Sequence, residues 1–310
     1  MQRRAAVIVF LSALALIARG QFNLSDPAFV GQQGGQQGSY VWDADATNWL
    51  NGQGIVATAN GADVNSRVST NINRLVLDAK TNGWWAKCDI IYPFIQPYGK
   101  WPSTTNNLKY ASYTSNAYNC VLTGSATTNT QGIVFAAAGY FKTGYKPSVV
   151  RNGGASGVTP TNCHIFIYTT ASTPSSGWVA GCNSGANDYL GIWFNAGYTW
   201  ITYAMDSSAN YPDANYGYSV GGIVCTRTNA DLTTLHQGTN TWNHSVTLTQ
   251  TNYTASEIYV GGRSYQDGIS SQFTGTIAGF TVGASIPTNV ASVFLADWAR
   301  YELGMGRRGW

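Results

Sequence analysis

The sequence predicts a mostly β protein: an antiparallel sandwich of jelly-roll or Greek-key type, with a short helical segment before it and one helix at its end. Short runs rich in Val, Ile, Tyr, Phe and Thr recur between turn signals, with no helical pattern between them. Only 10% of the residues are charged, whereas 13% are aromatic. Disordered chains have the opposite composition, so we expect strands joined by Gly- and Asn-rich turns.

Residues 1–39 are expected to lie outside the folded core. Arg3 and Arg4 precede an apolar run over residues 5–18, which is too short to cross a bilayer because a spanning helix needs about 20 residues. This layout is typical of a cleaved secretory signal peptide, and also of a hydrophobic arm that docks on a partner protein. The Gln- and Gly-rich stretch within residues 21–39 is expected to be a flexible linker.

Residues 40–98 are predicted to form a helical prelude packed on the sandwich. Asp43 or Asp45 can cap a short helix through Trp49, because a carboxylate accepts hydrogen bonds from first-turn N–H groups. A second helix is indicated by apolar residues at spacings of three and four, namely Val64, Val68, Ile72, Leu75 and Ala79.

Two adjacent tryptophans, Trp84 and Trp85, follow the second predicted helix and lead into the apolar run over residues 90–94, which is predicted to be a strand ended by Pro93. One interpretation is a stacking platform for sugars. Their apolar context favours the other interpretation, which is packing between helix and sheet.

The jelly-roll domain is assigned to residues 99–310 and closes with a helix over residues 290–303. His164 lies in a nearly continuous apolar run, which predicts a central strand with this histidine in the core. The five cysteines form no CxxC pair, so no zinc site is predicted, and their apolar surroundings favour buried thiols over a disulfide. The predicted strands cover residues 118–122, 132–135, 163–169, 178–182, 189–194, 200–205, 218–225, 231–236, 245–249, 257–262 and 273–282.

An ordered series of short motifs resembles a known family. The family comprises phage structural and appendage proteins that carry a concanavalin A-like lectin/glucanase (laminin-G-like) jelly-roll domain. The resemblance covers roughly residues 40–308 and departs at Cys88, where the family usually has Phe. The matching segments are residues 43–46 (DADA), 72–76 (INRLV), 85–94 (WAKCDIIYPF), 107–110 (NLKY), 257–263 (EIYVGGR) and the closing segment 298–307.

The resemblance implies the concanavalin A-like fold and a place in the virion, and it carries over no catalytic residue. The chain is therefore expected not to be an enzyme. Its two glutamates, Glu257 and Glu302, lie far apart in the sequence, and no ExDxxE strand supplies the paired carboxylates of a glycoside hydrolase. No nucleophile elbow accompanies the three histidines.

No cofactor is expected, although a structural calcium ion is chemically compatible with loop carboxylates at Asp206, Asp213 and Asp267. The formal net charge is +3, and no run of Lys or Arg exceeds two residues. Nucleic acid is therefore not expected as a partner, because phosphate binding needs a concentrated basic face.

Sugar-binding surfaces of β-sandwich lectins combine aromatic faces with Asn and Asp side chains. Residues 206–218 (DSSANYPDANYGY) have this mixture. The alternative for this segment is an ordinary surface loop whose tyrosines pack locally. The candidate ligand-binding residues are Tyr211, Asp213, Asn215, Tyr216, Trp242 and Tyr265.

The sequence therefore predicts a non-enzymatic virion structural protein, a decoration or tail-fiber-like appendage that displays a lectin-like jelly roll to host surface glycans. Its N-terminal arm would bind other virion proteins, and a homo-oligomer is expected. A secreted bacterial carbohydrate-binding protein is the alternative, and a glycoside hydrolase is the weaker one. Cleavage near Gln21 would distinguish the secreted protein from the virion protein.

Overall fold

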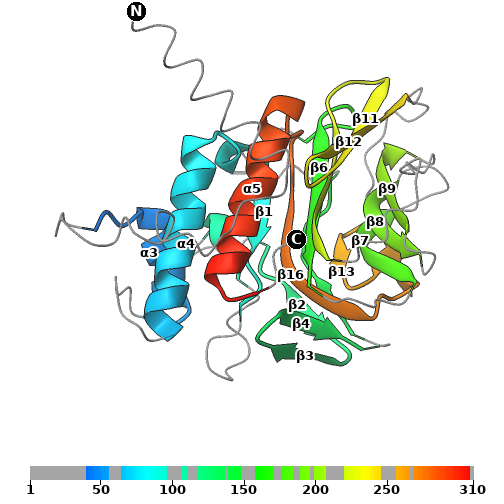
Figure 1. Ribbon diagram of the computed structural model, residues 1–310. Helices are drawn as coiled ribbons and strands as arrows, with labels where there is room; N and C mark the ends of the chain where they lie inside the picture. Colours follow the sequence, from blue (N-terminus) through cyan, green and yellow to red (C-terminus); the bar gives the residue numbers. More distant parts are fainter. Residues whose placement is uncertain are drawn as a thin grey trace, which may run out of the picture. The chain divides into compact units, whose positions relative to one another are not determined.

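Two sheets of eight strands each stack face to face in this protein, and helices cover the outer side of one sheet (Figure 1). The computed structural model describes residues 40–55, 64–95, 106–110, 118–136, 139–147, 158–170, 176–183, 189–195, 199–206, 220–245, 256–265 and 268–307. The predicted mostly β sandwich with a C-terminal helix is confirmed. The predicted arm and linker over residues 1–39 lie outside the described residues.

Sheet A runs in the order β12-β11-β10-β6-β16-β4-β3, and β1 also pairs with β16. Its strand pairings are antiparallel. All seven residues of β6 are buried, because this central strand has the opposite sheet on one face and helices on the other. The strands are β1 (Cys88–Tyr92), β3 (Ala126–Asn129), β4 (Gly132–Phe135), β6 (Cys163–Thr169), β10 (Gly221–Arg227), β11 (Leu232–Gln237), β12 (Asn240–Ser245) and β16 (Gly275–Gly283).

Sheet B runs in the order β15-β14-β7-β13-β5-β2, and β8 joins β7 to β9. Its pairings are antiparallel except for that between β14 and β7. The strands are β2 (Val121–Thr123), β5 (Tyr140–Lys142), β7 (Gly177–Asn183), β8 (Tyr189–Asn195), β9 (Thr199–Asp206), β13 (Tyr259–Val260), β14 (Arg263–Tyr265) and β15 (Gly268–Ser270).

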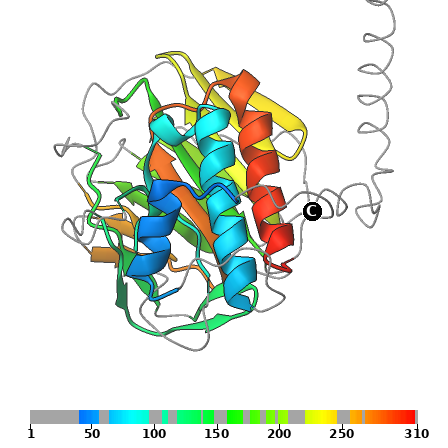
Figure 2. The same ribbon diagram turned by 90° about the vertical axis from the view of Figure 1, so that its left-hand side faces the viewer.

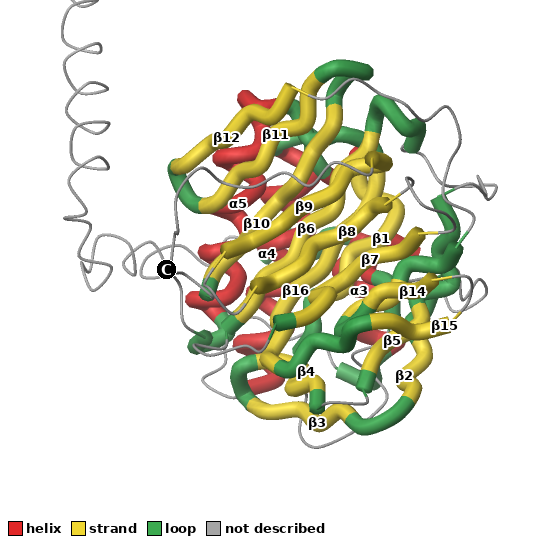
Figure 3. Tube along the Cα trace, turned by 90° about the vertical axis from the view of Figure 1, so that its right-hand side faces the viewer, coloured by secondary structure: helices red, strands yellow, loops and turns green. Residues whose placement is uncertain are grey.

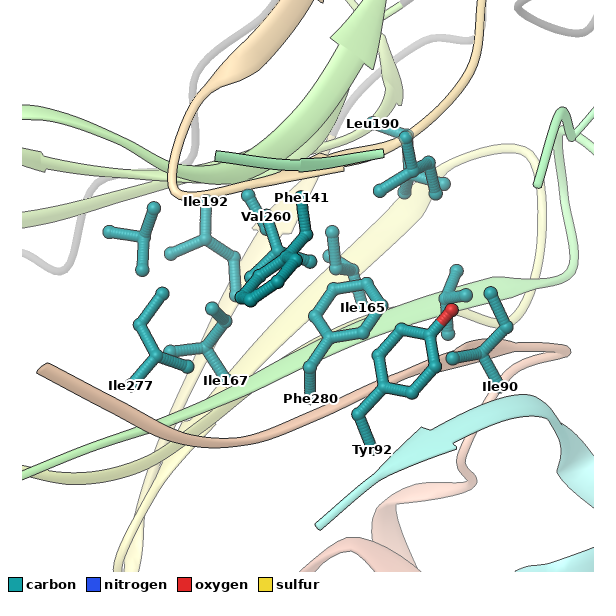
Figure 4. Packing of buried hydrophobic residues seen from close by; sticks show 14 of the residues in the cluster. Ile90, Tyr92, Phe141, Ile165, Ile167, Leu190, Ile192, Val260, Ile277 and Phe280 are labelled. Atoms are coloured by element: carbon teal, nitrogen blue, oxygen red, sulfur yellow. The ribbon is translucent and has the colours of Figure 1, made fainter. Parts of the chain in front are cut away.

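Side chains from both sheets meet in one hydrophobic core (Figure 4). Strand alternation sends every second side chain into this space. Aromatic rings join the two layers: Phe94 stacks on Phe141, with ring centroids 5.8 Å apart, and Phe141 meets Phe135 edge to face. The labelled residues that face one another are Ile90, Tyr92, Ile165, Ile167, Ile277 and Phe280 from sheet A and Phe141, Leu190, Ile192 and Val260 from sheet B.

A second hydrophobic core lies under α4 (Val64–Thr81) and α5 (Thr288–Gly304), which cover the outer face of sheet A (Figure 2). The shorter α3 (Ala44–Gly52) packs on α4 and begins at Asp43, whose carboxylate accepts a hydrogen bond from the Asp45 N–H at 2.9 Å. The predicted cap is therefore Asp43. Two short 3-10 helices, η2 (Trp85–Lys87) and η4 (Leu108–Tyr110), connect this layer to β1.

The tryptophan pair divides between two environments. Trp84 is completely buried, meets Phe294 edge to face at 4.9 Å, and donates its indole N–H to Asp297 at 2.8 Å. Helix-to-sheet packing is thus the correct interpretation for Trp84. Trp85 is half-buried, and the Lys109 ammonium lies 4.6 Å from its ring centroid.

One predicted strand needs correction, and another is described only at its first residue. Of the strand expected at residues 245–249, only Ser245 is described, and it ends β12. β12 begins at Asn240, because Gly238 adopts a positive φ of 58° and closes a tight hairpin from β11. The strand expected at 257–262 breaks at Gly261, whose φ is 86°. A side chain at Gly261 would also collide with the Phe135 ring. All five cysteines are free and buried, as the sequence indicated.

Candidate functional site

An aromatic cluster with one arginine lies on the outer face of sheet B, the face turned toward the viewer in Figure 3. On β8, Leu190, Ile192 and Phe194 point into the core between the sheets. Alternation therefore turns the remaining side chains of β8 outward. We call the resulting group the sheet B cluster, and its members are Trp178, Tyr189, Trp193, Arg263 and Tyr265.

Trp178 is the centre of the sheet B cluster. Its ring is parallel to that of Tyr189, with centroids 5.9 Å apart and an interplanar angle of 9°. The ring of Trp193 also contacts that of Trp178, with centroids 5.6 Å apart. Trp178 is 1% exposed and yet belongs to neither hydrophobic core.

Two facing glycines make room for this indole. Gly181 on β7 pairs with Gly191 on β8. A Cβ added at Gly191 would lie 2.7 Å from Cζ3 of Trp178, and one added at Gly181 would lie 3.2 Å from Cε3. The indole therefore lies directly over the glycine backbone, which only residues without a side chain permit.

Arg263 stacks against three rings of the cluster. Its guanidinium carbon lies 4.7 Å from the Trp178 centroid, 5.2 Å from Tyr189 and 5.8 Å from Tyr265. Alternation along β14 explains this placement, because Ser264 between the two outward residues is buried. Such cation–π contacts contribute roughly 0.5–2 kcal/mol each, depending on desolvation.

The polar groups of the cluster are only partly satisfied. One Nη of Arg263 donates to the Ser270 hydroxyl at 3.1 Å. No carboxylate in the described part of the chain pairs with Arg263, and its buried Nε has no hydrogen-bond partner there. The buried indole N–H of Trp193 also lacks a partner among the described residues. The cluster thus combines flat apolar rings with two buried donors that have no partner among the described residues.

Both glutamates and one of the histidines are engaged by contacts within the fold. Glu257 accepts a hydrogen bond from the Gly144 N–H at 2.5 Å. Glu302 is buried against Arg307 at 2.9 Å, and burial raises the pKa of Glu302 to about 7. Burial lowers the pKa of His164 to about 4, and its Nδ1 lies 2.5 Å from the Ala284 carbonyl oxygen.

Within the residues that can be described, no group of three or more His, Cys, Asp or Glu side chains is placed to hold a metal ion. Of the predicted calcium ligands, Asp206 ends β9, and Asp213 and Asp267 lie outside the described residues. No helix in the described ranges is long and apolar enough to cross a membrane.

The predicted ligand-binding residues fall in three places. Tyr265 ends β14, is 43% exposed and belongs to the sheet B cluster. Trp242 was expected in a loop but lies in β12 of sheet A, opposite Leu235, where it packs against the core between the sheets. The remaining four lie outside the described residues: Tyr211, Asp213, Asn215 and Tyr216.

Sequence reasoning placed Trp178, Tyr189 and Trp193 on strands but missed their common outward face. The segment YLGIWF of β8 is apolar on both faces, so simple alternation of polar and apolar residues is absent. In a two-layer sandwich, large outward aromatics next to a glycine are the signal that identifies such a surface.

Comparison with solved structures finds distant β-sandwich neighbours. A Trypanosoma rangeli sialidase mutant displaying trans-sialidase activity matches with a TM-score of 0.47 and 10% identity, over 76% of this chain and 39% of that enzyme. Domain 4 of the Geobacillus stearothermophilus arabinanase AbnA, in complex with arabinotriose, has a TM-score of 0.44 and 10% identity, over 67% and 97%. The CBM40 domain of a Ruminococcus gnavus sialidase, bound to sialyllactose, has a TM-score of 0.35 and 11% identity, over 49% of this chain and 92% of that domain.

These likenesses are too distant to assign a function, since all three TM-scores are below 0.5. The chain spans less than two fifths of the length of the Trypanosoma rangeli enzyme. No protein-family model matches the chain, and no curated protein matches it significantly. Functional inference therefore depends on the residues of the chain itself.

Proposed function

We propose that this chain is a carbohydrate-binding β-sandwich protein whose ligand stacks on the sheet B cluster. The observation that carries the proposal is the group of Trp193, Tyr265 and Arg263 around a buried Trp178 on the outer face of a sheet. The C–H face of a sugar ring packs on flat aromatic rings, and its hydroxyl oxygens accept hydrogen bonds from donors at their rim.

Packing alone gives no reason for this arrangement. A sheet face that only meets solvent is usually polar, whereas contiguous aromatic residues on a surface mark interaction sites. Tyr265 is one of few large hydrophobic residues with substantial exposure in the described chain. Rigid aromatic side chains also lose little conformational entropy on binding, because they have only two side-chain torsions.

The finer part of the proposal is that the domain is displayed on a virion, as a structural, decoration or fiber-like appendage protein that attaches to host surface glycans without catalysis. Its support is the resemblance of residues 72–76 and 85–94 to phage structural proteins. The engagement of Glu302 by Arg307 and of Glu257 by a backbone N–H agrees with a non-catalytic role. A secreted lectin-like protein is the second candidate, favoured by the signal-like segment at residues 5–18.

A glycan array probed with the full chain tests the proposal. Wild type is expected to bind a subset of bacterial surface polysaccharides, and Trp193→Ala is expected to lose that binding while keeping the far-UV circular dichroism of wild type. Val293→Ala on the helix-covered side, where Val293 is 39% exposed, is the matched control and should bind normally. Absence of binding to every glycan, or full binding by Trp193→Ala, would contradict the proposal.

The location is tested separately by mass spectrometry of the native source. Peptides that include residues 5–18 in purified particles would support the virion protein. A mature chain that begins near Gln21 in culture medium would support the secreted protein instead.

A further inference from the structure

We infer that the ligand of the sheet B cluster carries an anionic group, a carboxylate or sulfate on a sugar, and that Arg263 binds it. This inference rests on the proposed glycan-binding function and specifies the class of sugar. It starts from the one cation in the cluster and from the fact that no acidic side chain in the described part of the chain neutralises it.

Three basic residues of this protein are paired with carboxylates, whereas Lys109 is held by the Trp85 carbonyl at 2.6 Å and by the Trp85 ring. Arg307 is fully paired: it binds the Glu302 carboxylate at 2.9 Å and donates to the Phe94 carbonyl. Arg300 pairs with Asp78 at 2.7 Å, and Lys80 pairs with Asp43 at 2.7 Å. Each of these three cations has its countercharge within the fold.

Arg263 differs because contacts fix its position, although no acidic side chain in the described part of the chain pairs with its charge. Stacking on Trp178 and Tyr189 and one hydrogen bond to Ser270 hold the guanidinium on the outer face of the sheet. The Nε–H has no acceptor in the described chain. A guanidinium presents its Nε–H and a neighbouring Nη–H as a fork that matches two oxygens of a carboxylate or sulfate.

The Nε atom is buried, so an anion reaches that fork only when a side chain beside it moves. Tyr265, the ring at 5.8 Å, is 43% exposed and ends its strand. The proposal assigns this movement to the Tyr265 ring. The cluster would therefore place a sugar ring on the aromatic surface and the anionic substituent on Arg263.

The class of ligand follows from the combination of flat rings with a cation that has no acidic partner in the described chain. A neutral sugar would use the rings but leave the guanidinium without an anion. An acidic pyranose, such as a uronic acid, a sialic acid or a sulfated sugar, satisfies both. The carboxylate and the sulfate ester share the chemistry that Arg263 recognises and are distinguished by the choice of probe.

The experiment is isothermal titration of the full chain with three acidic glycans and their neutral counterparts. The pairs are oligogalacturonate and its methyl ester, sialyllactose and lactose, and chondroitin sulfate oligosaccharides with the sulfate removed chemically and the carboxyl esterified. At least one acidic form is expected to bind about tenfold or more tightly than its neutral counterpart, with an advantage that shrinks between 0.05 and 0.5 M NaCl. A preference in the oligogalacturonate or sialyllactose pair identifies a carboxylate. A preference confined to the chondroitin pair is resolved by titrating the desulfated oligosaccharide with its carboxyl group intact.

Arg263→Gln is expected to remove the preference for the acidic form, so that the acidic and the neutral form bind with similar affinities. Arg263→Lys keeps the charge and should keep part of the preference, since an ammonium lacks the fork. Both variants are checked for wild-type unfolding temperature. Equal binding of acidic and neutral forms by wild type, or an unchanged preference in Arg263→Gln, would overturn the inference while glycan binding stands. No binding of any glycan would instead overturn the proposed function itself.

Discussion

The outer faces of the two sheets carry similar aromatic clusters in opposite settings. On sheet A, Phe166 lies beneath Trp84, Phe294 and Trp298, and the helices α4 and α5 cover the group, so all four rings are buried. On sheet B, the rings around Trp178 are half-buried or exposed, and no described helix lies over them.

Charge distinguishes the two faces more sharply than the aromatic residues do. An indole N–H without a partner among the described residues occurs on both, at Trp298 and at Trp193. On the covered face, however, Arg300 pairs with Asp78 and Asp297. On the open face, no carboxylate in the described part of the chain pairs with Arg263. The same residue types therefore serve packing where a second layer covers them, and are available for binding where none of the described elements does.

The largest contrast is expected between two tryptophan truncations. Trp298→Ala should lower the free energy of unfolding by about 3–5 kcal/mol, because it leaves a large cavity under the helices. Trp193→Ala should cost about 1 kcal/mol or less, since its ring is half-buried, while it abolishes glycan binding. Urea denaturation of both variants measures this difference, and equal losses of stability would contradict it.

Two arginines offer the next contrast. Arg307→Met should destabilise the fold by about 3 kcal/mol at pH 8, because it leaves the buried Glu302 carboxylate without its partner. Arg263→Met should cost less stability, since it removes cation–π contacts and one hydrogen bond but no ion pair in the described chain. If thermal unfolding ranks the two variants the other way, Arg263 is a structural cation.

A smaller effect is expected from adding one methyl group beneath the indole of Trp178. Gly191→Ala places a Cβ 2.7 Å from Trp178 and 2.7 Å from the Ala180 carbonyl oxygen, so we expect a loss of about 1–3 kcal/mol together with weaker glycan binding. Gly268→Ala is the matched control, because its Cβ would meet the Tyr265 carbonyl oxygen at an ordinary 3.4 Å. Unchanged binding by a folded Gly191→Ala variant would show that the position of Trp178 is not needed.

Two buried groups beneath the helices should make the stability depend on pH in different pH ranges. His164, which meets Phe294 edge to face, has its pKa lowered from 6.5 to about 4 by burial. The folded state therefore prefers the neutral ring, and its contribution to stability is present above pH 6.5 and is lost as the pH falls toward 4. NMR titration of the imidazole should give a pKa near 4. A value near 6.5 would contradict the burial of His164.

The pKa shift of Glu302 makes the stability depend on pH in the opposite direction. Its pKa is raised from 4.5 to about 7 by burial, so the folded state binds a proton more tightly than the unfolded chain does. Its contribution is present below pH 4.5 and is lost as the pH rises through 7. The pH profile of wild type therefore contains both terms, and the NMR titration of His164 separates them.

The sequence predicted those parts of the fold whose pattern is complete within one element. The run from Cys163 to Thr169 is apolar throughout because both its faces are covered, and the apolar spacing from Val64 to Ala79 marks a helix buried on one side. The strands β3, β5, β14 and β15 were not predicted, since three or four residues are too short to show a period. They are defined by their pairing partners.

The candidate site was harder to predict because it depends on register. Tyr265 was identified from its local context, but its partner Arg263 follows a break at Gly261 that only the packed Phe135 ring explains. Trp178 and Trp193 come together through the pairing of β7 with β8. Contacts of this kind between strands leave no trace in the spacing of residues along one strand.

The most direct test of the glycan-binding face is a ¹H–¹⁵N spectrum of the tryptophan indole groups, recorded as a bound glycan is titrated into the full chain. Trp193→Phe and Trp84→Phe assign the two relevant signals. The indole signal of Trp193 is expected to shift with ligand concentration, whereas that of Trp84, held by Asp297 beneath the helices, should stay in place. A shift of Trp84 with no change at Trp193 would place the ligand elsewhere and contradict binding at the sheet B cluster.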